Sequence, residues 1–163
     1  MKVVIVGGVA GGASVATRLR RMDEQAEIVL LERGPYISFA NCGLPYYIGG
    51  IIAERDALLV QTPEALRAVF AIDARIHQNV RSIDRQSKTV TAEDERTRET
   101  YTESYDKLVL SPGAAPLVPP LPGADLPGVF TLRTIPNVDA IKAFVDQQLV
   151  AEAELMAMLG EEN

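Results

Sequence analysis

Cys42 is the only cysteine of this 163-residue chain, and its side chain is the one best suited to nucleophilic chemistry. It lies in a stretch, residues 38–50, that is rich in glycine, proline and aromatic residues and lacks a regular hydrophobic period. We therefore predict a long loop with one helical turn after Cys42, a kind of segment that is often functional. The start of a helical turn favours the thiolate, which is the nucleophilic form of cysteine. The plainer alternative is a small buried hydrophobic residue.

The glycines between residues 7 and 12 indicate a second kind of chemistry, the binding of phosphate. They follow a β-branched run at residues 3–6 and precede alanines and leucines at helical spacing, in the order Gly7-Gly8-Val9-Ala10-Gly11-Gly12. In a strand-turn-helix unit of this kind, backbone amides and the positive end of the helix dipole meet a pyrophosphate. Val9 stands where the G-x-G-x-x-G fingerprint has its middle glycine, so a purely structural glycine turn is also compatible.

Glu32 ends a second apolar run, residues 27–32. It follows the glycines by about 20 residues, where dinucleotide-binding folds carry the acid that accepts a hydrogen bond from a ribose hydroxyl. The alternative is a solvated acid at the end of a strand. Together with the glycine turn, Glu32 predicts the binding of an adenine dinucleotide.

The remaining pattern predicts the α/β elements that position these residues. Consecutive apolar residues at 27–32 and 107–110 are typical of strands covered on both faces of a parallel sheet. Thr62-Pro63-Glu64 predicts the start of a helix that runs to about Phe70. Short β-like stretches predict an antiparallel meander, with His77 in a surface strand and the acids 93–95 in a solvated turn. These stretches are residues 75–80, 88–92 and 99–103, and a proline-rich loop and a helix from about Pro136 follow them.

Composition excludes several classes of partner. The net charge is -6 and no run of basic residues is present, which argues against nucleic acid. The first apolar run is too short for a signal segment or a membrane span, so we expect a cytoplasmic protein. His77 is the only histidine, which argues against a metal site.

Three segments together resemble the single-cysteine branch of the pyridine nucleotide-disulfide oxidoreductases, which includes coenzyme A-disulfide reductases, persulfide reductases and NADH oxidases. They are the glycine turn with its valine, the loop Ser38-Phe39-Ala40-Asn41-Cys42-Gly43-Leu44-Pro45-Tyr46-Tyr47, and the segment Tyr105-Asp106-Lys107-Leu108-Val109-Leu110-Ser111-Pro112-Gly113-Ala114. Related two-cysteine enzymes carry a second cysteine where this chain has Tyr47, so an internal redox disulfide is excluded. Asn41 and residues 44–46 look more like the coenzyme A or persulfide group than the NADH oxidases, which stay as an alternative.

The resemblance implies that NAD(P)H reduces FAD, and that electrons pass to Cys42, which forms a mixed disulfide with coenzyme A or a persulfide. Asn41 would assist as a hydrogen-bond donor to the substrate. The implied FAD contacts are Gly7, Gly8, Val9, Ala10, Gly11, Gly12, Glu32, Arg33, Val80, Ser111, Pro112, Gly113 and Arg133. The implied substrate contacts are Ser14, Arg18, Arg21, Ser38 and Asn41. Arg18 and Arg21 also fit the simpler role of offsetting a helix dipole.

The predicted fold is a Rossmann-like FAD-binding domain over residues 1–148, with a central parallel sheet and a small antiparallel meander. A helical tail of unclear origin follows at residues 149–163. No second glycine turn appears, so we expect the chain to stop before an NAD(P)H domain and to be incomplete for turnover. The complete enzyme is expected to be a homodimer. A nucleotide-binding module without catalysis is the alternative.

Overall fold

The computed structural model describes the backbone of residues 1–160 and the side chains of residues 1–152. The chain forms two compact units. The first contains Met1–Phe39 and Leu59–Ala114, and the second contains Ala40–Leu58 and Ala115–Asn163. The predicted boundary at residue 148 falls inside a single helix, α4 (Ile135–Gly160).

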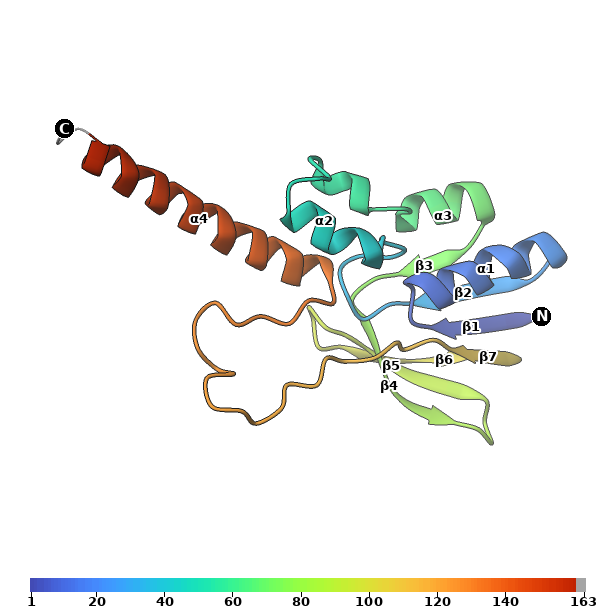
Figure 1. Cartoon of the computed structure of the whole chain (residues 1–163). Coiled ribbons are helices and arrows are strands. Elements are labelled where there is room, and N and C mark those ends of the chain that lie inside the picture. The colour runs from blue at the N-terminus through green and yellow to red at the C-terminus, as the bar shows by residue number, and fades with distance from the viewer. Residues whose placement is uncertain (161–163) are drawn as a thin grey trace. The chain divides into compact units, whose positions relative to one another are not determined.

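A four-stranded parallel sheet forms the centre of the first unit (Figure 1). Its strands lie in the order β3 (Asp73–Arg75), β2 (Glu27–Leu31), β1 (Lys2–Val6) and β7 (Lys107–Leu110). Val4 is in register with Val29 of β2 on one side and with Leu108 of β7 on the other. Because the strands are parallel, their carboxyl ends share one edge of the sheet, which is where open α/β sheets bind ligands.

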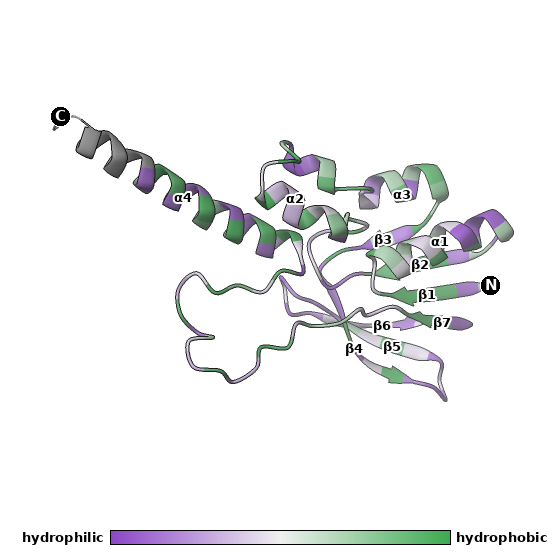
Figure 2. Ribbon diagram, in the orientation of Figure 1, coloured by the Kyte–Doolittle hydropathy of each residue, from purple (hydrophilic) through white to green (hydrophobic). Residues whose placement is uncertain are grey.

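Alternating side chains of β1 and β2 enter two hydrophobic cores, one on each face of the sheet. One face packs against helices α1 (Ala10–Met22) and α3 (Pro63–Phe70), and the other packs against the antiparallel strands. The consecutive apolar residues of β2 predicted a strand that is covered on both faces of the sheet, and the structure confirms this prediction. Hydrophobic residues accordingly dominate β1 in Figure 2. The helix-side core includes Val3, Ile5, Ala16, Ile28, Leu30 and Leu66, and the meander-side core includes Val4, Val29, Leu31, Val90 and Ala92.

The predicted antiparallel meander is present as β4 (Gln78–Asp84), β5 (Thr89–Asp94) and β6 (Thr100–Ser104). The predicted bounds of its first strand, residues 75–80, are wrong, because Arg75 ends β3 of the parallel sheet and β4 begins only at Gln78. His77 is not in a strand: it has a left-handed φ of 60° and is half-buried between β3 and β4. Its backbone bonds hold this connection, since its N–H donates to Gly34 O and its carbonyl accepts from Glu95 N–H.

The prediction of a solvated acidic turn at residues 93–95 is also wrong. Glu93 and Asp94 belong to β5, and Glu93 is buried. Two arginines from the neighbouring backbone compensate its charge: Arg81 Nε lies 2.8 Å and Arg98 Nε 2.8 Å from the Glu93 carboxylate. A carboxylate is accommodated in this position because both partners reach it.

β7 is an edge strand of the described sheet and is not fully buried, in contrast to the prediction for residues 107–110. Its two central residues, Leu108 and Val109, are half-buried, while Leu110 is exposed. The apolar run reflects the faces that Leu108 and Val109 present to the two cores.

Helix α3 begins where predicted, because Thr62 Oγ1 accepts the Ala65 N–H at 3.1 Å as an N-cap. Arg20, near the end of α1, connects this helix to the backbone around it. Its guanidinium donates to five backbone carbonyls, three in the turn between α1 and β2 and two at the end of α3. These carbonyls belong to Phe70 at 2.8 Å, Asp23 at 3.3 Å, Glu24 at 2.6 Å, Ala26 at 2.7 Å and Ala71 at 3.0 Å.

The second unit contains two 3₁₀ turns, η1 (Asn41–Gly43) and η2 (Arg55–Leu58), and the helices α2 (Leu44–Ile48) and α4. α2 packs against α4. Arg55 connects η2 to α4 through two parallel bonds to Asp139, Nε to Oδ1 and Nη2 to Oδ2, both 2.7 Å. This is the bidentate geometry that makes an arginine-carboxylate pair strong.

Helix α4 begins near the predicted residue, with Thr134 and Asn137 exchanging hydrogen bonds at its first turn. Along α4, Figure 2 shows hydrophobic and hydrophilic residues in alternation. Among the residues that the structure describes, no helix is long and apolar enough to cross a membrane.

Candidate functional site

Two glycines of the turn after β1 are required by close backbone contacts. Gly7 has a φ of 94°, and a Cβ on it would lie 2.0 Å from Ser111 O. A Cβ on Gly12 would lie 1.8 Å from Gly7 O. A side chain at either position would overlap backbone atoms, so β1, α1 and the segment after β7 meet closely here only because both residues are glycine.

Val9 explains why the fingerprint tolerates a non-glycine residue. It is the N-cap residue of α1, with a φ of −83°, so no positive φ is needed at this position. No side chain caps α1, which leaves the first backbone amides of the helix for another acceptor. Uncapped amides at the positive end of a helix dipole are suited to accept hydrogen bonds from an anion.

Glu32 braces the same turn. Its Oε2 accepts the Gly8 N–H at 2.6 Å and its Oε1 accepts the Gly34 N–H at 2.7 Å. The carboxylate therefore connects the glycine turn to the loop after β2. Each carboxylate oxygen has a second lone pair and can accept a further hydrogen bond, for example from a hydroxyl group.

A cavity of about 240 Å³ opens at the carboxyl ends of β1 and β2. It brings together five of the predicted cofactor contacts, from four separate parts of the chain: Gly7, Glu32, Arg33, Val80 and Pro112. It is also lined by Gln78 and Asn79, which the sequence analysis missed. Neither residue carries a sequence signal, because their position depends on how β4 crosses the end of the parallel sheet.

The other predicted contacts of the first unit surround the glycine turn. A Cβ on Gly11 would lie 3.2 Å from Ser111 Oγ, and Ser111 N–H donates to Val6 O at 2.7 Å. Gly113 has a φ of 71°. Ser38, with a φ of 49°, donates its N–H to Gly8 O at 3.0 Å.

Three of the predicted substrate contacts, Ser14, Arg18 and Arg21, lie on α1 and are exposed. The two arginines are three residues apart, so they share one side of the helix. Their exposure separates them from Arg20, whose donors are all directed to backbone carbonyls.

The predicted thiol loop belongs to the second unit. Cys42 is exposed in η1, and α2 follows it directly, which confirms a helical turn after the cysteine and excludes a buried residue. Gly43 is buried, and a Cβ there would lie 2.9 Å from Leu58 Cδ2, so η1 packs closely on η2. Asn41 Oδ1 is buried and has no hydrogen-bond partner in the described part of the chain. Arg133 is exposed in this unit, and its N–H donates to Asn137 Oδ1 at 3.2 Å.

In the described part of the chain, no group of three or more histidine, cysteine and acidic side chains is arranged to hold a metal ion. The fold and the glycine turn instead define a dinucleotide-binding α/β protein. The chain belongs to the pyridine nucleotide-disulphide oxidoreductase family, whose sequence pattern matches residues 1–151. Enzymes of this family use FAD and NAD(P)H.

Comparison with individual proteins agrees with this family. The chain is 41% identical over 152 residues to a coenzyme A disulfide reductase of Staphylococcus haemolyticus, covering 93% of this chain and 34% of that protein. The structure of reduced CoADR-RHD from Bacillus anthracis is similar with a TM-score of 0.87 and 56% identity, over 90% of this chain and 27% of that one. An NAD-dependent persulfide reductase from A. fulgidus is similar with a TM-score of 0.84 and 36% identity, over 90% and 27% of the two chains. The chain thus spans about a third of the length of the curated relatives that it matches.

Proposed function

We propose that this chain forms the FAD-binding part of an NAD(P)H-dependent reductase that acts on coenzyme A disulfide, or on a related persulfide, through Cys42. The observation that carries the proposal is the joint arrangement of the glycine turn, the Glu32 carboxylate and the cavity beside them. These features suit the adenosine and pyrophosphate half of FAD, because the uncapped amides of α1 accept a diphosphate and Glu32 accepts a ribose hydroxyl.

In this proposal Gly7 and Gly12 allow the backbone to approach the pyrophosphate, and the α1 amides bind its charge. Glu32 and Arg33 hold the ribose side, with Val80, Ser111, Pro112, Gly113 and Arg133 as further contacts. When bound, FAD would supply two-electron transfer from NAD(P)H to the mixed disulfide formed at Cys42.

Cys42 supplies the thiol chemistry of the proposal. Its thiolate attacks one sulfur of the substrate disulfide, so that a new bond forms to Cys42 Sγ while the original disulfide breaks and one coenzyme A thiolate leaves. An exposed thiol in a short helical segment is accessible for this attack. Asn41 is the proposed hydrogen-bonding partner of the substrate beside the thiol.

Arg18 and Arg21, together with Ser14 and Ser38, are proposed to bind the phosphates of coenzyme A. Exposed guanidinium groups on one side of a helix suit a ligand that carries several phosphates, since arginine donates in pairs to phosphate oxygens. The names of the similar proteins, coenzyme A disulfide reductase and persulfide reductase, support this substrate class. For the complete protein we propose a homodimer, which size-exclusion chromatography with light scattering would test.

The first test is flavin binding by the purified chain, followed by absorption spectroscopy on addition of FAD. A bound flavin spectrum supports the proposal, and its absence with excess FAD contradicts it. The second test mixes the reduced protein with coenzyme A disulfide and measures the mass of the product. We expect the gain of one coenzyme A on Cys42 and none in the Cys42→Ser variant.

Pantethine, a disulfide without the nucleotide phosphates, separates substrate recognition from simple thiol reactivity. Replacing both Arg18 and Arg21 by alanine should slow the reaction with coenzyme A disulfide and leave that with pantethine unchanged. If both reactions slowed equally, or neither slowed, these arginines would not belong to the substrate site. In the complete protein, NADH oxidation that needs oxygen and no disulfide would favour the NADH oxidase alternative.

A further inference from the structure

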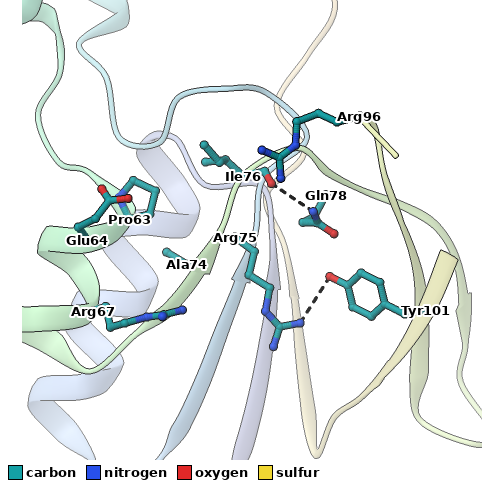
Figure 3. Close-up of a pocket in the computed structure, with 9 residues that line it drawn as sticks. All are labelled: Pro63, Glu64, Arg67, Ala74, Arg75, Ile76, Gln78, Arg96 and Tyr101. Carbon is teal, nitrogen blue, oxygen red and sulfur yellow. Dashed lines mark hydrogen bonds between the residues drawn. The ribbon is translucent and has the colours of Figure 1, made fainter. Parts of the chain in front are cut away.

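A second, larger pocket lies in the first unit, between α3 and the antiparallel strands, and it has no role in the proposed reaction. Its volume is about 620 Å³, which is within the range that holds small organic ligands. Figure 3 shows that Arg67 comes from α3 on one side, whereas Arg96 and Tyr101 come from the meander on the other. Arg75 of β3 lies between them.

The three arginines differ in how firmly they are held. Arg75 is fixed, because its Nε and Nη2 donate to Asp73 and its Nη1 donates to Glu103 at 2.7 Å. The side chain of Arg67 is 70% exposed and makes one bond, from Nη2 to Asp73 at 2.9 Å. The side chain of Arg96 is 64% exposed, and its bonds to Asp94 are long, 3.3 Å and 3.5 Å.

Arg67 and Arg96 therefore retain N–H donors that no described residue uses. The two guanidinium groups are exposed, although Asp73 and Asp94 are partly buried, so an incoming anion can reach the unused donors without displacing the aspartates. A phosphate group suits these donors, because its oxygens accept pairs of hydrogen bonds from arginine.

The carboxylates around the pocket outnumber its guanidinium groups, so binding of an anion here depends on direct hydrogen bonds from arginine and not on net charge. Asp73, Asp94 and Glu103 pair with the arginines, and Glu64 adds a carboxylate to the lining. The pocket also has an apolar surface, formed by Ala74, Ile76 and the ring of Tyr101. The combination fits a ligand with one anionic group and a flat apolar part.

We propose that this pocket binds a small phosphate ester, with the phosphate held by Arg67 and Arg96 and a flat apolar group against Ala74, Ile76 and Tyr101. The pocket is separate from the cavity beside Glu32, although Gln78 lines both. This site is independent of the proposed reductase chemistry, because it uses neither the glycine turn nor Cys42.

Phenyl phosphate is the probe, titrated into the isotope-labelled chain while backbone amide shifts are followed by NMR. We expect saturable binding with a dissociation constant of about 1 mM or lower. The shifts should concentrate at residues 63–67, 74–78, 96 and 101. No saturable binding in that range, or shifts confined to other residues, would overturn the proposal.

Variants test the assigned groups. Arg67→Ala and Arg96→Ala should each weaken binding about tenfold, as expected for the loss of a charged hydrogen-bonding partner. Both side chains are exposed, so neither replacement should unfold the protein. The matched control is Arg85→Ala, which removes an exposed arginine from the turn between β4 and β5 and should leave the affinity unchanged. Equal affinity in the Arg67 and Arg96 variants would contradict the assignment.

Three further titrations distinguish other kinds of binding. Inorganic phosphate should bind at least about tenfold more weakly than phenyl phosphate, because it lacks the apolar part. Benzoate binding as tightly as phenyl phosphate would refute the phosphate assignment. Displacement of phenyl phosphate by stoichiometric FAD would place the probe in the dinucleotide cavity and refute a separate site.

Discussion

Replacing Glu32 by glutamine tests the link between the acid and the glycine turn. The substitution keeps the size of the side chain but replaces one acceptor oxygen by an amide group that donates. In the native protein both oxygens accept backbone N–H groups, from Gly8 at 2.6 Å and from Gly34 at 2.7 Å. In Glu32→Gln one of these N–H groups faces a donor, and the other bonds to a neutral oxygen.

The magnitude follows from these two bonds. A hydrogen bond to a charged group contributes about 1.5–3 kcal/mol, and a neutral one about 1 kcal/mol. Losing one charged bond and weakening the other should lower the free energy of unfolding by about 2–3 kcal/mol. FAD should bind about 10- to 100-fold more weakly, because the proposed acceptor for the ribose hydroxyl is weakened as well.

Urea unfolding followed by circular dichroism measures the first effect, and quenching of flavin fluorescence measures the second. Glu24→Gln is the matched control, since it removes an exposed charge and should change stability by less than about 0.5 kcal/mol. Unchanged stability in Glu32→Gln would show that the carboxylate does not brace the turn. Reduced stability with unchanged FAD affinity would show that the flavin site lies elsewhere.

Three other substitutions have definite expected outcomes. Arg20→Ala removes five donors to backbone carbonyls and should lower the free energy of unfolding by about 2–4 kcal/mol in a urea titration, whereas Arg21→Ala should change it little. Gly12→Ala places a Cβ 1.8 Å from a backbone oxygen, so it should lower the free energy of unfolding by at least about 2 kcal/mol and abolish FAD binding. At Gly49 the atom nearest to an added Cβ is 3.5 Å away, so alanine should be tolerated there. Burial alone would raise the pKa of Glu103, but hydrogen bonds from Lys2 and Arg75 outweigh it and hold the pKa below its ordinary value. Its ionised form therefore stabilises the fold above about pH 4.5 and this stabilisation is lost as the pH falls further, so the stability difference between the native protein and Glu103→Gln should shrink below about pH 4.

Local signals predicted the first βαβ unit and α3, and non-local contacts explain what the sequence analysis missed. The cap at Thr62 and the apolar run of β2 act within a few residues, so their sequence is sufficient to find them. The burial of Glu93 depends on Arg81 and Arg98, which reach it from neighbouring backbone. The assignment of Arg75 to the parallel sheet depends on its register with Leu31. Neither the burial of Glu93 nor the register of Arg75 produces a periodic pattern in the sequence.

The candidate site shows the same division. The glycines, Glu32 and Cys42 could be found because their residue types have few other uses at those spacings. Gln78 and Asn79 could not, because they reach the cavity only through the path of the chain between β3 and β4. That path depends on the left-handed conformation of His77, and a histidine in a sequence does not by itself predict such a turn.

The glycine turn and Glu32 are best understood as one structural unit. The strict fingerprint has a glycine where this chain has Val9, yet the φ of Val9 is −83°, so this position does not need the positive φ that favours glycine. The indispensable positions are those where backbone meets backbone, Gly7 against Ser111 and Gly12 against Gly7. Gly8 N–H is then held by Glu32, which fixes the turn before any ligand arrives. A site arranged in advance loses less conformational entropy on binding, so the acid should contribute to nucleotide affinity through the turn as well as through its own hydrogen bond.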